Sequence, residues 1–392
     1  MKGHEDLPAL LMLLGVSVVG PVVAVRLKLP TPVILMLAGI ALGPAGTGLL
    51  QDLPTVAFLS EFGFLLLMFM AGMEIDFDGL RAAGPRALAT PLLLVAGVFA
   101  GAIAIGSLAH LGIIEILAIS AMSVGMPLAV LKETRHDVNA LGKHVLLTAS
   151  IGEFAAILAV TGLEVAKTPG TRWNAAVAVA KVTALFVGSA LLIRWARALV
   201  WWYPEPFRRL IAHKDVAEMG VRVGLVVMLA FVAIAAVAGV EPILGAFIGG
   251  ALIGFVLRQK HALEDKLAAL GNGLFIPIFF VVVGVRFEAS SLDRHAIQTA
   301  GLMALFLGAT RLVPSLVFAP KGMPMRRRAA AGSLLSAPLT LVVAIGAIGG
   351  ELGLLSKPKQ ATLVLVAMLV SVIFPTLFRV AAGPAEEPAS AD

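Results

Sequence analysis

The sequence predicts an all-α polytopic membrane protein, and three observations carry that prediction. Of the 392 residues, 59% are hydrophobic and only 14% are charged, whereas a soluble domain has about 25% charged residues. Thirteen apolar runs follow one another along the chain, and each is about long enough for a helix to cross a bilayer. The chain has no cysteine, which excludes disulfides and thiolate metal sites.

The predicted spans are joined by short connections, so we expect one membrane transport domain over residues 1–392. The tail, residues 383–392, is rich in Pro, Ala and acidic residues and is expected to be flexible. In chain order, the spans are placed at about 8–25, 31–50, 54–73, 87–109, 113–131, 143–166, 174–200, 217–239, 242–257, 271–286, 297–318, 329–350 and 360–382.

Lysine and arginine are distributed unevenly between the two sides of these spans. If the N-terminus is outside, the cytoplasmic connections and the adjoining span ends hold 21 of the 30 Lys and Arg, and the outside segments hold 7. This is the positive-inside pattern. It predicts a multi-pass protein of the cell inner (plasma) membrane, with its N-terminus outside and its C-terminus cytoplasmic. The net charge of +6 is explained in this way, and we expect no nucleic-acid partner.

The fifth and twelfth predicted spans each contain a proline, Pro127 and Pro338, beside small hydroxyl residues. These hydroxyl residues are Ser123 in the fifth span and Ser336 and Thr340 in the twelfth. A proline inside a span frees a backbone carbonyl, which then needs another partner. Interrupted segments in corresponding positions of two halves of a chain indicate a transporter binding site.

The spacing of the interrupted spans also predicts an internal repeat. They lie seven spans apart, as expected for two six-span halves, at about 8–166 and 217–382, joined by a linker helix at about 174–200. Because seven is an odd number, the two halves have opposite orientations in the membrane. The repeat is therefore predicted to be inverted.

Two charged residues lie deep within predicted spans and are the main site candidates. Glu153 is in the middle of the apolar run 145–163, close to Thr148, and Arg311 is in the middle of the eleventh span. An ionisable side chain at that depth is costly and is a functional hypothesis by default. The two side chains are expected to converge near the interrupted spans. They form either a structural ion pair or a site where a proton and a cation compete for one carboxylate.

Four stretches carry a family resemblance: Leu29–Pro44, Phe64–Asp76, Pro242–Leu252 and Phe279–Gly284. Together they resemble the monovalent cation:proton antiporter-2 family. The resemblance implies thirteen helices, crossed unwound helices, a panel and a core domain, elevator-type alternating access and a homodimer. It places Glu153 where the family keeps its ion-binding aspartate and Arg311 where it keeps a core Lys or Arg. The chain departs from the family in having Gly152 before Glu153, where a polar residue is usual.

The leading hypothesis for function is a secondary transporter that exchanges Na⁺ or K⁺ for H⁺, without net charge movement. Glu153 would bind the metal cation or the proton, and Thr148, Ser123, Ser336 and Thr340 would offer further oxygens. One alternative is a transporter of the same fold that moves an organic anion or metabolite, using Arg311. Another is a channel-like cation conduit. An enzyme is not expected, because no catalytic constellation is visible, and no cofactor is expected.

Overall fold

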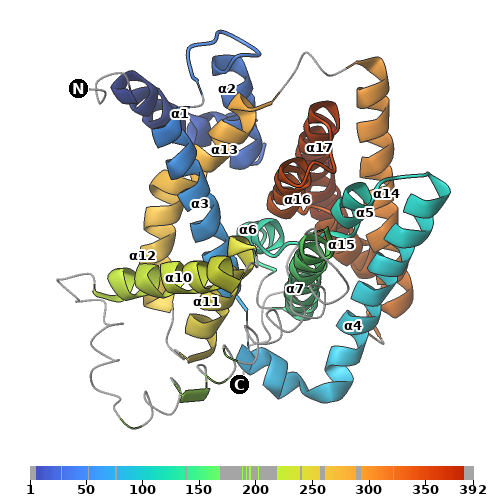
Figure 1. The fold of residues 1–392 in the computed structure, drawn as a ribbon. Helices are drawn as coiled ribbons and strands as arrows, with labels where there is room; N and C mark the ends of the chain where they lie inside the picture. Colours follow the sequence, from blue (N-terminus) through green and yellow to red (C-terminus); the bar gives the residue numbers. More distant parts are fainter. Residues whose placement is uncertain are drawn as a thin grey trace. The chain divides into compact units, whose positions relative to one another are not determined.

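The structure, a computed structural model, is helical throughout the part of the chain that it describes (Figure 1). Ten of the described helical segments are long and apolar enough to cross a membrane, and Thr31–Leu42 and Pro242–Val256 are shorter apolar helices. The described residues are 6–27, 29–51, 53–75, 77–136, 139–167, 219–238, 241–256, 261–287, 293–320 and 322–383, with residues 188, 191, 194, 195 and 202.

Twelve of the thirteen expected spans correspond to described helices or pairs of helices, and the fold class is confirmed. The linker span expected at 174–200 lies outside the described residues, apart from a few single positions, so the count of thirteen is not confirmed. The second span is shorter than expected, because α2 (Thr31–Leu42) ends before Gly43. Pro44 and the left-handed Gly48, with φ of 68°, turn the chain there, and both residue types favour turns over helix.

The chain divides into two compact units, Met1–Phe77 with Thr161–Arg286, and Asp78–Val160 with Phe287–Asp392. We call them unit 1 and unit 2 and describe each by itself. The described helices of unit 1 are α1 (Asp6–Leu27), α2, α3 (Pro54–Met73), α10 (Met219–Ala238), α11 (Pro242–Val256), α12 (His261–Leu270), the π-helix η1 (Gly271–Phe275) and α13 (Ile276–Val285).

Unit 1 is built on two helix pairs whose backbones approach closely. Helix α2 packs on α13, and α3 packs on α11. A Cβ added at Gly284 would lie 2.9 Å from the Cα of Gly39, and one added at Gly72 would lie 2.8 Å from the backbone nitrogen of Ala251. Small residues at such contacts allow close packing between membrane helices, where dispersion replaces the hydrophobic effect.

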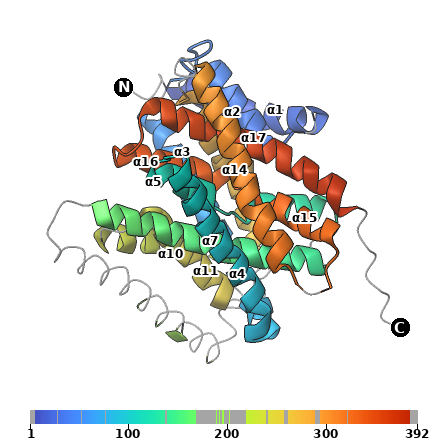
Figure 2. The same cartoon turned by 90° about the vertical axis from the view of Figure 1, so that its right-hand side faces the viewer.

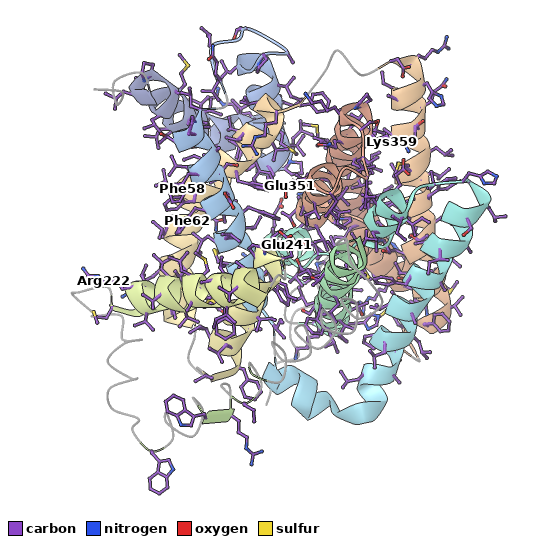
Figure 3. The ribbon with its side chains drawn as sticks, viewed as in Figure 1. Phe58, Phe62, Arg222, Glu241, Glu351 and Lys359 are labelled. Carbon is purple, nitrogen blue, oxygen red and sulfur yellow. The ribbon has the colours of Figure 1, made fainter. Side chains whose placement is uncertain are left out.

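Aromatic rings close the contact between α3 and η1 in unit 1. Phe58 and Phe62 lie one turn apart on α3 (Figure 3), with ring centroids 6.3 Å apart. The ring of Phe62 lies 4.7 Å from that of Phe275, at the end of η1. A π-helical turn is rare and often marks a functional or strained position, and the sequence patterns did not predict it.

Unit 2 contains both interrupted helices. Its described elements are α4 (Phe77–Leu108), α5 (Ile113–Ser120), α6 (Gly125–Glu133), α7 (Ala140–Lys167), α14 (Arg294–Phe318), α15 (Met325–Leu335), α16 (Leu339–Glu351) and α17 (Lys357–Ala382).

The structure confirms that the fifth and twelfth expected spans are interrupted, and it locates the breaks. Residues 121–124 separate α5 from α6, and residues 336–338 separate α15 from α16. Pro127 lies within the first turn of α6, whereas Pro338 is the N-cap of α16. Proline suits both places because the first turn of a helix leaves its N–H groups unpaired in any case.

Helices α5 and α16 lie side by side and run antiparallel (Figures 1 and 2). A Cβ added at Gly349, near the end of α16, would lie 2.7 Å from Ile114, near the start of α5. At the other end of the pair, the hydroxyl of Ser123 lies 3.1 Å from that of Thr340. The two breaks therefore meet.

Helix α17 holds both halves of the first interrupted helix. Lys359, in its first turn (Figure 3), forms an ion pair of 2.9 Å with the buried Glu115 of α5. Arg379, in its last turn, forms an ion pair of 2.8 Å with Glu133, the last residue of α6. Helix α17 is thus joined by ion pairs to the start of α5 and to the end of α6, the two ends of the interrupted helix.

Apolar side chains pack α7 against four other elements of unit 2. None of the buried members of this cluster is more than 6% exposed, so α7 is held along much of its length. The cluster includes Leu94, Val95 and Val98 of α4, Val130 and Leu131 of α6, Leu141, Val145 and Ala149 of α7, Leu334 and Leu335 of α15, and Phe378 of α17.

Candidate functional site

The carboxylate of Glu153 is fully buried in unit 2 and bonds to the break between α5 and α6. Its side chain is 0% exposed. One carboxylate oxygen accepts a hydrogen bond of 3.0 Å from the backbone N–H of Val124, and the other accepts one of 3.3 Å from the hydroxyl of Ser123. Val124 is the N-cap of α6, and the N-terminal end of a helix carries partial positive charge. The carboxylate is therefore held by neutral donors and a helix end.

The hydroxyl of Ser123 connects this carboxylate to the second break. It lies 3.3 Å from Glu153 and 3.1 Å from the hydroxyl of Thr340, which is in the first turn of α16. Ser123 is 4% exposed, and Thr340 is half-buried. Side-chain oxygens from α7, from the first break and from α16 thus form a continuous chain.

Arg311 is also fully buried, but it bonds to the opposite end of the first break. Its guanidinium donates to the carbonyls of Ile119 and Ala121, at the C-terminal end of α5. It also donates to the carbonyl of Leu307 and to the hydroxyl of Thr310, both at 2.8 Å. The carbonyls at the C-terminal end of a helix lack helical partners and carry partial negative charge, so the arginine caps α5.

The expected convergence of Glu153 and Arg311 is therefore present, but it is indirect. Each side chain bonds to a different end of the residues 119–124, and among the described residues the structure gives no ion pair between the two. Glu153 interacts with the start of α6, and Arg311 interacts with the end of α5. The negative carboxylate thus lies at the positive end of the α6 dipole, and the positive guanidinium lies at the negative end of the α5 dipole.

Two further predicted ligands, Thr148 and Ser336, are buried near the site without touching the carboxylate. Each is 0% exposed. The hydroxyl of Thr148 donates to the carbonyl of His144 at 2.7 Å, and that of Ser336 donates to the carbonyl of Gly332 at 2.7 Å. Both donors are used within their own helix, which leaves the oxygen lone pairs as acceptors. The structure gives neither residue a hydrogen bond to Glu153.

Met122 fills the space beside Gly152, the residue that precedes Glu153. A Cβ added at Gly152 would lie 2.8 Å from the Cβ and 3.0 Å from the Cγ of Met122, and it would also meet its sulfur. Met122 is in the break and is 0% exposed. A thioether thus occupies the position where a side chain at residue 152 would lie.

Sequence reasoning expected free main-chain carbonyls in the interrupted segments, but it did not identify which main-chain groups bond to the two charged side chains. Glu153 accepts a hydrogen bond from the N–H of Val124, and Arg311 donates to the carbonyls of Ile119 and Ala121. No residue type marks such groups, although the predicted interruption is a signal that they are free. Thr310, next to Arg311, was also missed. So was His144, which is 8% exposed and whose Nε2 has no hydrogen-bond partner in the structure.

Chemically, the arrangement provides one carboxylate and several neutral oxygens in a buried place. Within the described residues, no group of three or more His, Cys, Asp or Glu side chains is placed to hold a metal ion. Hydroxyl, carbonyl and carboxylate oxygens suit hard cations. Buried charge beside broken helices in a multi-pass protein defines the class of membrane transport proteins.

The family described as "Sodium/hydrogen exchanger, transmembrane" matches residues 13–380, and the chain belongs to it. The chain is 28% identical to the putative Na⁺/H⁺ antiporter YjbQ of Bacillus subtilis, over 96% of its own length and 63% of that protein. It is 29% identical to the probable Na⁺/H⁺ antiporter 3 of Methanocaldococcus jannaschii, over 94% of each chain. It is 27% identical to the Na⁺/H⁺-K⁺ antiporter GerN of Bacillus cereus, also over 94% of each chain.

A solved structure supports the fold. The sodium proton antiporter MjNhaP1 of Methanocaldococcus jannaschii superposes with a TM-score of 0.67, covering 99% of this chain and 100% of that one. The sequence identity is 14%, so this likeness concerns the fold alone. The resemblance noted from the sequence is confirmed at the level of the family.

Proposed function

We propose that this protein exchanges Na⁺ or K⁺ for H⁺ across the membrane, and that Glu153 is the residue that binds each in turn. The observation that carries the proposal is the buried carboxylate, whose bonds in the structure come from neutral donors. A carboxylate without an adjacent positive side chain gains most from binding a proton or a metal cation. The names of the relatives in Bacillus subtilis and Bacillus cereus support this class of substrate.

The cation would be held by oxygens that the two breaks bring together. Glu153 supplies the charge, and Ser123 and Thr340 supply hydroxyl oxygens that already lie in one chain. Main-chain carbonyls of the breaks, together with Thr148 and Ser336, complete the set of acceptors available nearby. A proton on Glu153 removes the charge that attracts the cation, so the two ligands exclude each other.

Alternating access would follow from a displacement of unit 2. Glu153, Arg311 and both interrupted helices all belong to that unit, so the unit would carry the complete site with it. This is the elevator-type movement that the family resemblance implies. A homodimer and an outside N-terminus stay predictions of the same kind.

The helix pairs of unit 1 support the proposed inverted repeat. The second and third expected spans are α2 and α3, and their counterparts in the second half are α11 and α13. In a pair of halves related by a two-fold axis, a contact between the second span of one half and the third span of the other must occur again with the halves exchanged. Helix α2 packs on α13 and α3 packs on α11, as this relation requires.

A single carboxylate at the site implies electroneutral exchange. Glu153 releases one proton for each monovalent cation, and Arg311 stays protonated, so no net charge moves. An imposed membrane potential, set with valinomycin, should therefore not drive sustained Na⁺ uptake into proteoliposomes. Vesicles with Glu153→Gln protein control for leakage. Uptake that the potential alone sustains only in wild-type vesicles would mean that a second proton carrier exists.

The two alternative functions are less well supported. An organic anion would need an accessible positive group, and Arg311 is fully buried, with both terminal nitrogens bonded to protein oxygens and only its Nε without a partner. A channel-like conduit would conduct without coupling to protons. Flux that saturates and responds to an opposing pH gradient distinguishes a carrier from such a conduit.

The direct test is transport by the purified protein in proteoliposomes with a pH-sensitive dye inside. With an imposed proton gradient, addition of Na⁺ or K⁺ should move protons in the opposite direction, with Li⁺ as a third cation tested. Protein-free vesicles are the control. If none of the three cations moves protons at any pH between about 6 and 9, the proposed exchange is wrong.

A further inference from the structure

Three consecutive residues of the first break contact two consecutive residues of α7. Ser123 and Val124 hold the carboxylate of Glu153. Met122, the residue before them, packs on Gly152, the residue before Glu153. The polar and the apolar contact are therefore made by neighbouring residues of the same two segments.

The packing of Met122 on Gly152 is specific and tight. Three side-chain atoms of Met122 lie where a side chain at position 152 would begin. Gly152 is itself buried, and Met122 belongs to an apolar cluster with Val124 and Ala149. The contact leaves no room for a water molecule between Met122 and Gly152, and the polar partners given for the carboxylate all come from the break.

We propose that Met122 determines cation selectivity, by acting as an apolar wall that keeps water from the flank of Glu153 beside Gly152. The inference rests on the proposed function, since it concerns the cation that Glu153 binds. A cation beside this wall must lose the water molecules that it would hold on that side, and only protein oxygens can replace them in its coordination shell. The thioether is a weak acceptor and a poor ligand for a hard cation.

The wall is expected to disfavour the larger cation. Selectivity between cations depends on cavity size and on the number and flexibility of the ligands, and K⁺ needs more room and more oxygens than Na⁺. Truncating Met122 to alanine removes three heavy atoms, and two of them, the sulfur and the Cγ, now border Gly152. The space released lies beside Gly152, one residue before Glu153, and under the proposal it would admit a water molecule that shares the carboxylate or the hydroxyl of Ser123 as a partner.

The test compares the apparent affinities for Na⁺ and K⁺ of wild-type and Met122→Ala protein in the dye assay. We expect the preference for Na⁺ over K⁺ to fall about tenfold in the variant. Met68→Ala, which truncates a buried methionine in α3 of unit 1, is the control for general destabilisation and should leave the preference unchanged. An equal change in both affinities, or no change, would overturn the proposal.

A second set of variants tests the contact itself without relying on transport. Gly152→Ala should lower the thermal stability of the purified protein, because the new Cβ meets Met122. Combining it with Met122→Ala should recover part of that loss, because the variant removes the sulfur and the Cγ but keeps the Cβ, 2.8 Å from the added Cβ. If the two substitutions are additive in melting temperature, the wall is not in contact with position 152 and the inference fails. If wild-type protein shows no exchange while this recovery is seen, the contact stands, but the proposed function and the selectivity role that rests on it both fail.

Discussion

The hydroxyl oxygens of Ser123 and Thr340 lie 3.1 Å apart, although 217 positions separate them in the chain. This contact joins the two breaks, and Ser123 continues it to the carboxylate of Glu153. The two interrupted helices therefore form one site, and neither break alone provides it.

The contact predicts that the two hydroxyls act together in cation binding. Ser123→Ala and Thr340→Val should each weaken the apparent cation affinity. The double variant should be less impaired than the sum of the two, by about 0.5–3 kcal/mol, as residues in direct contact usually are. A double-mutant cycle on affinities from the dye assay measures this coupling energy. Strictly additive effects would show that the hydroxyls serve the cation separately or not at all.

Arg311 is predicted to be essential for the shape of the first break. In Arg311→Ala, the carbonyls of Ile119 and Ala121 lose their donor, and an unsatisfied buried group costs about 1–3 kcal/mol. We expect a strong loss of thermal stability in detergent together with loss of exchange. Arg311→Lys, which keeps the charge but only one nitrogen, should recover part of both. If Arg311→Ala unfolds at the wild-type temperature, the arginine does not hold the break.

The span positions were predictable from the sequence because a membrane helix needs about 20 apolar residues, a local property. The interruptions at Pro127 and Pro338 were visible for the same reason. The expected second span extended to residue 50, beyond the end of α2, because residues 43–48 carry no charge and Leu49 and Leu50 are apolar again. The π-helical turn at Gly271–Phe275 has no such signature.

The candidate site was predictable only in part. Glu153 and Arg311 stand out as charges in apolar runs, and their convergence follows from the interrupted spans. Their bonding partners do not, because Val124 and Ala121 contribute main-chain groups whose directions depend on the path of the break. The packing of Met122 on position 152 depends in the same way on tertiary structure.

Close backbone packing in unit 1 gives a prediction about stability. A Cβ at Gly284 would meet the carbonyl of Met36 and lie 2.9 Å from the backbone nitrogen of Ile40. Gly284→Ala should therefore force α2 and α13 apart and destabilise the protein by about 1–3 kcal/mol.

The matched control for that variant is Gly301→Ala in α14. Gly301 has nothing within 4 Å of an added Cβ, so this change should be neutral or raise stability by up to about 1 kcal/mol. Thermal unfolding of the two purified variants makes the comparison. Equal melting temperatures would contradict the role of Gly284 in the helix contact.

The charge distribution predicts the orientation in the membrane. Because the chain has no cysteine, single cysteines can be introduced at Ser356, before α17, and at Ser390 in the tail. An impermeant maleimide on intact cells should label position 356 and spare position 390. Permeabilised cells, in which both should react, provide the control. Labelling of position 390 alone would mean that the orientation is reversed.

The central claim is that a proton and a metal cation compete for Glu153. It is tested most directly by proton release from the purified protein in weakly buffered detergent solution when Na⁺ or K⁺ is added. Wild-type protein should release up to one proton for each cation bound, with apparent cation affinity falling as the pH is lowered. Glu153→Gln should fold and release none. Undiminished cation-dependent proton release from Glu153→Gln protein would contradict the assignment of the shared site to this residue.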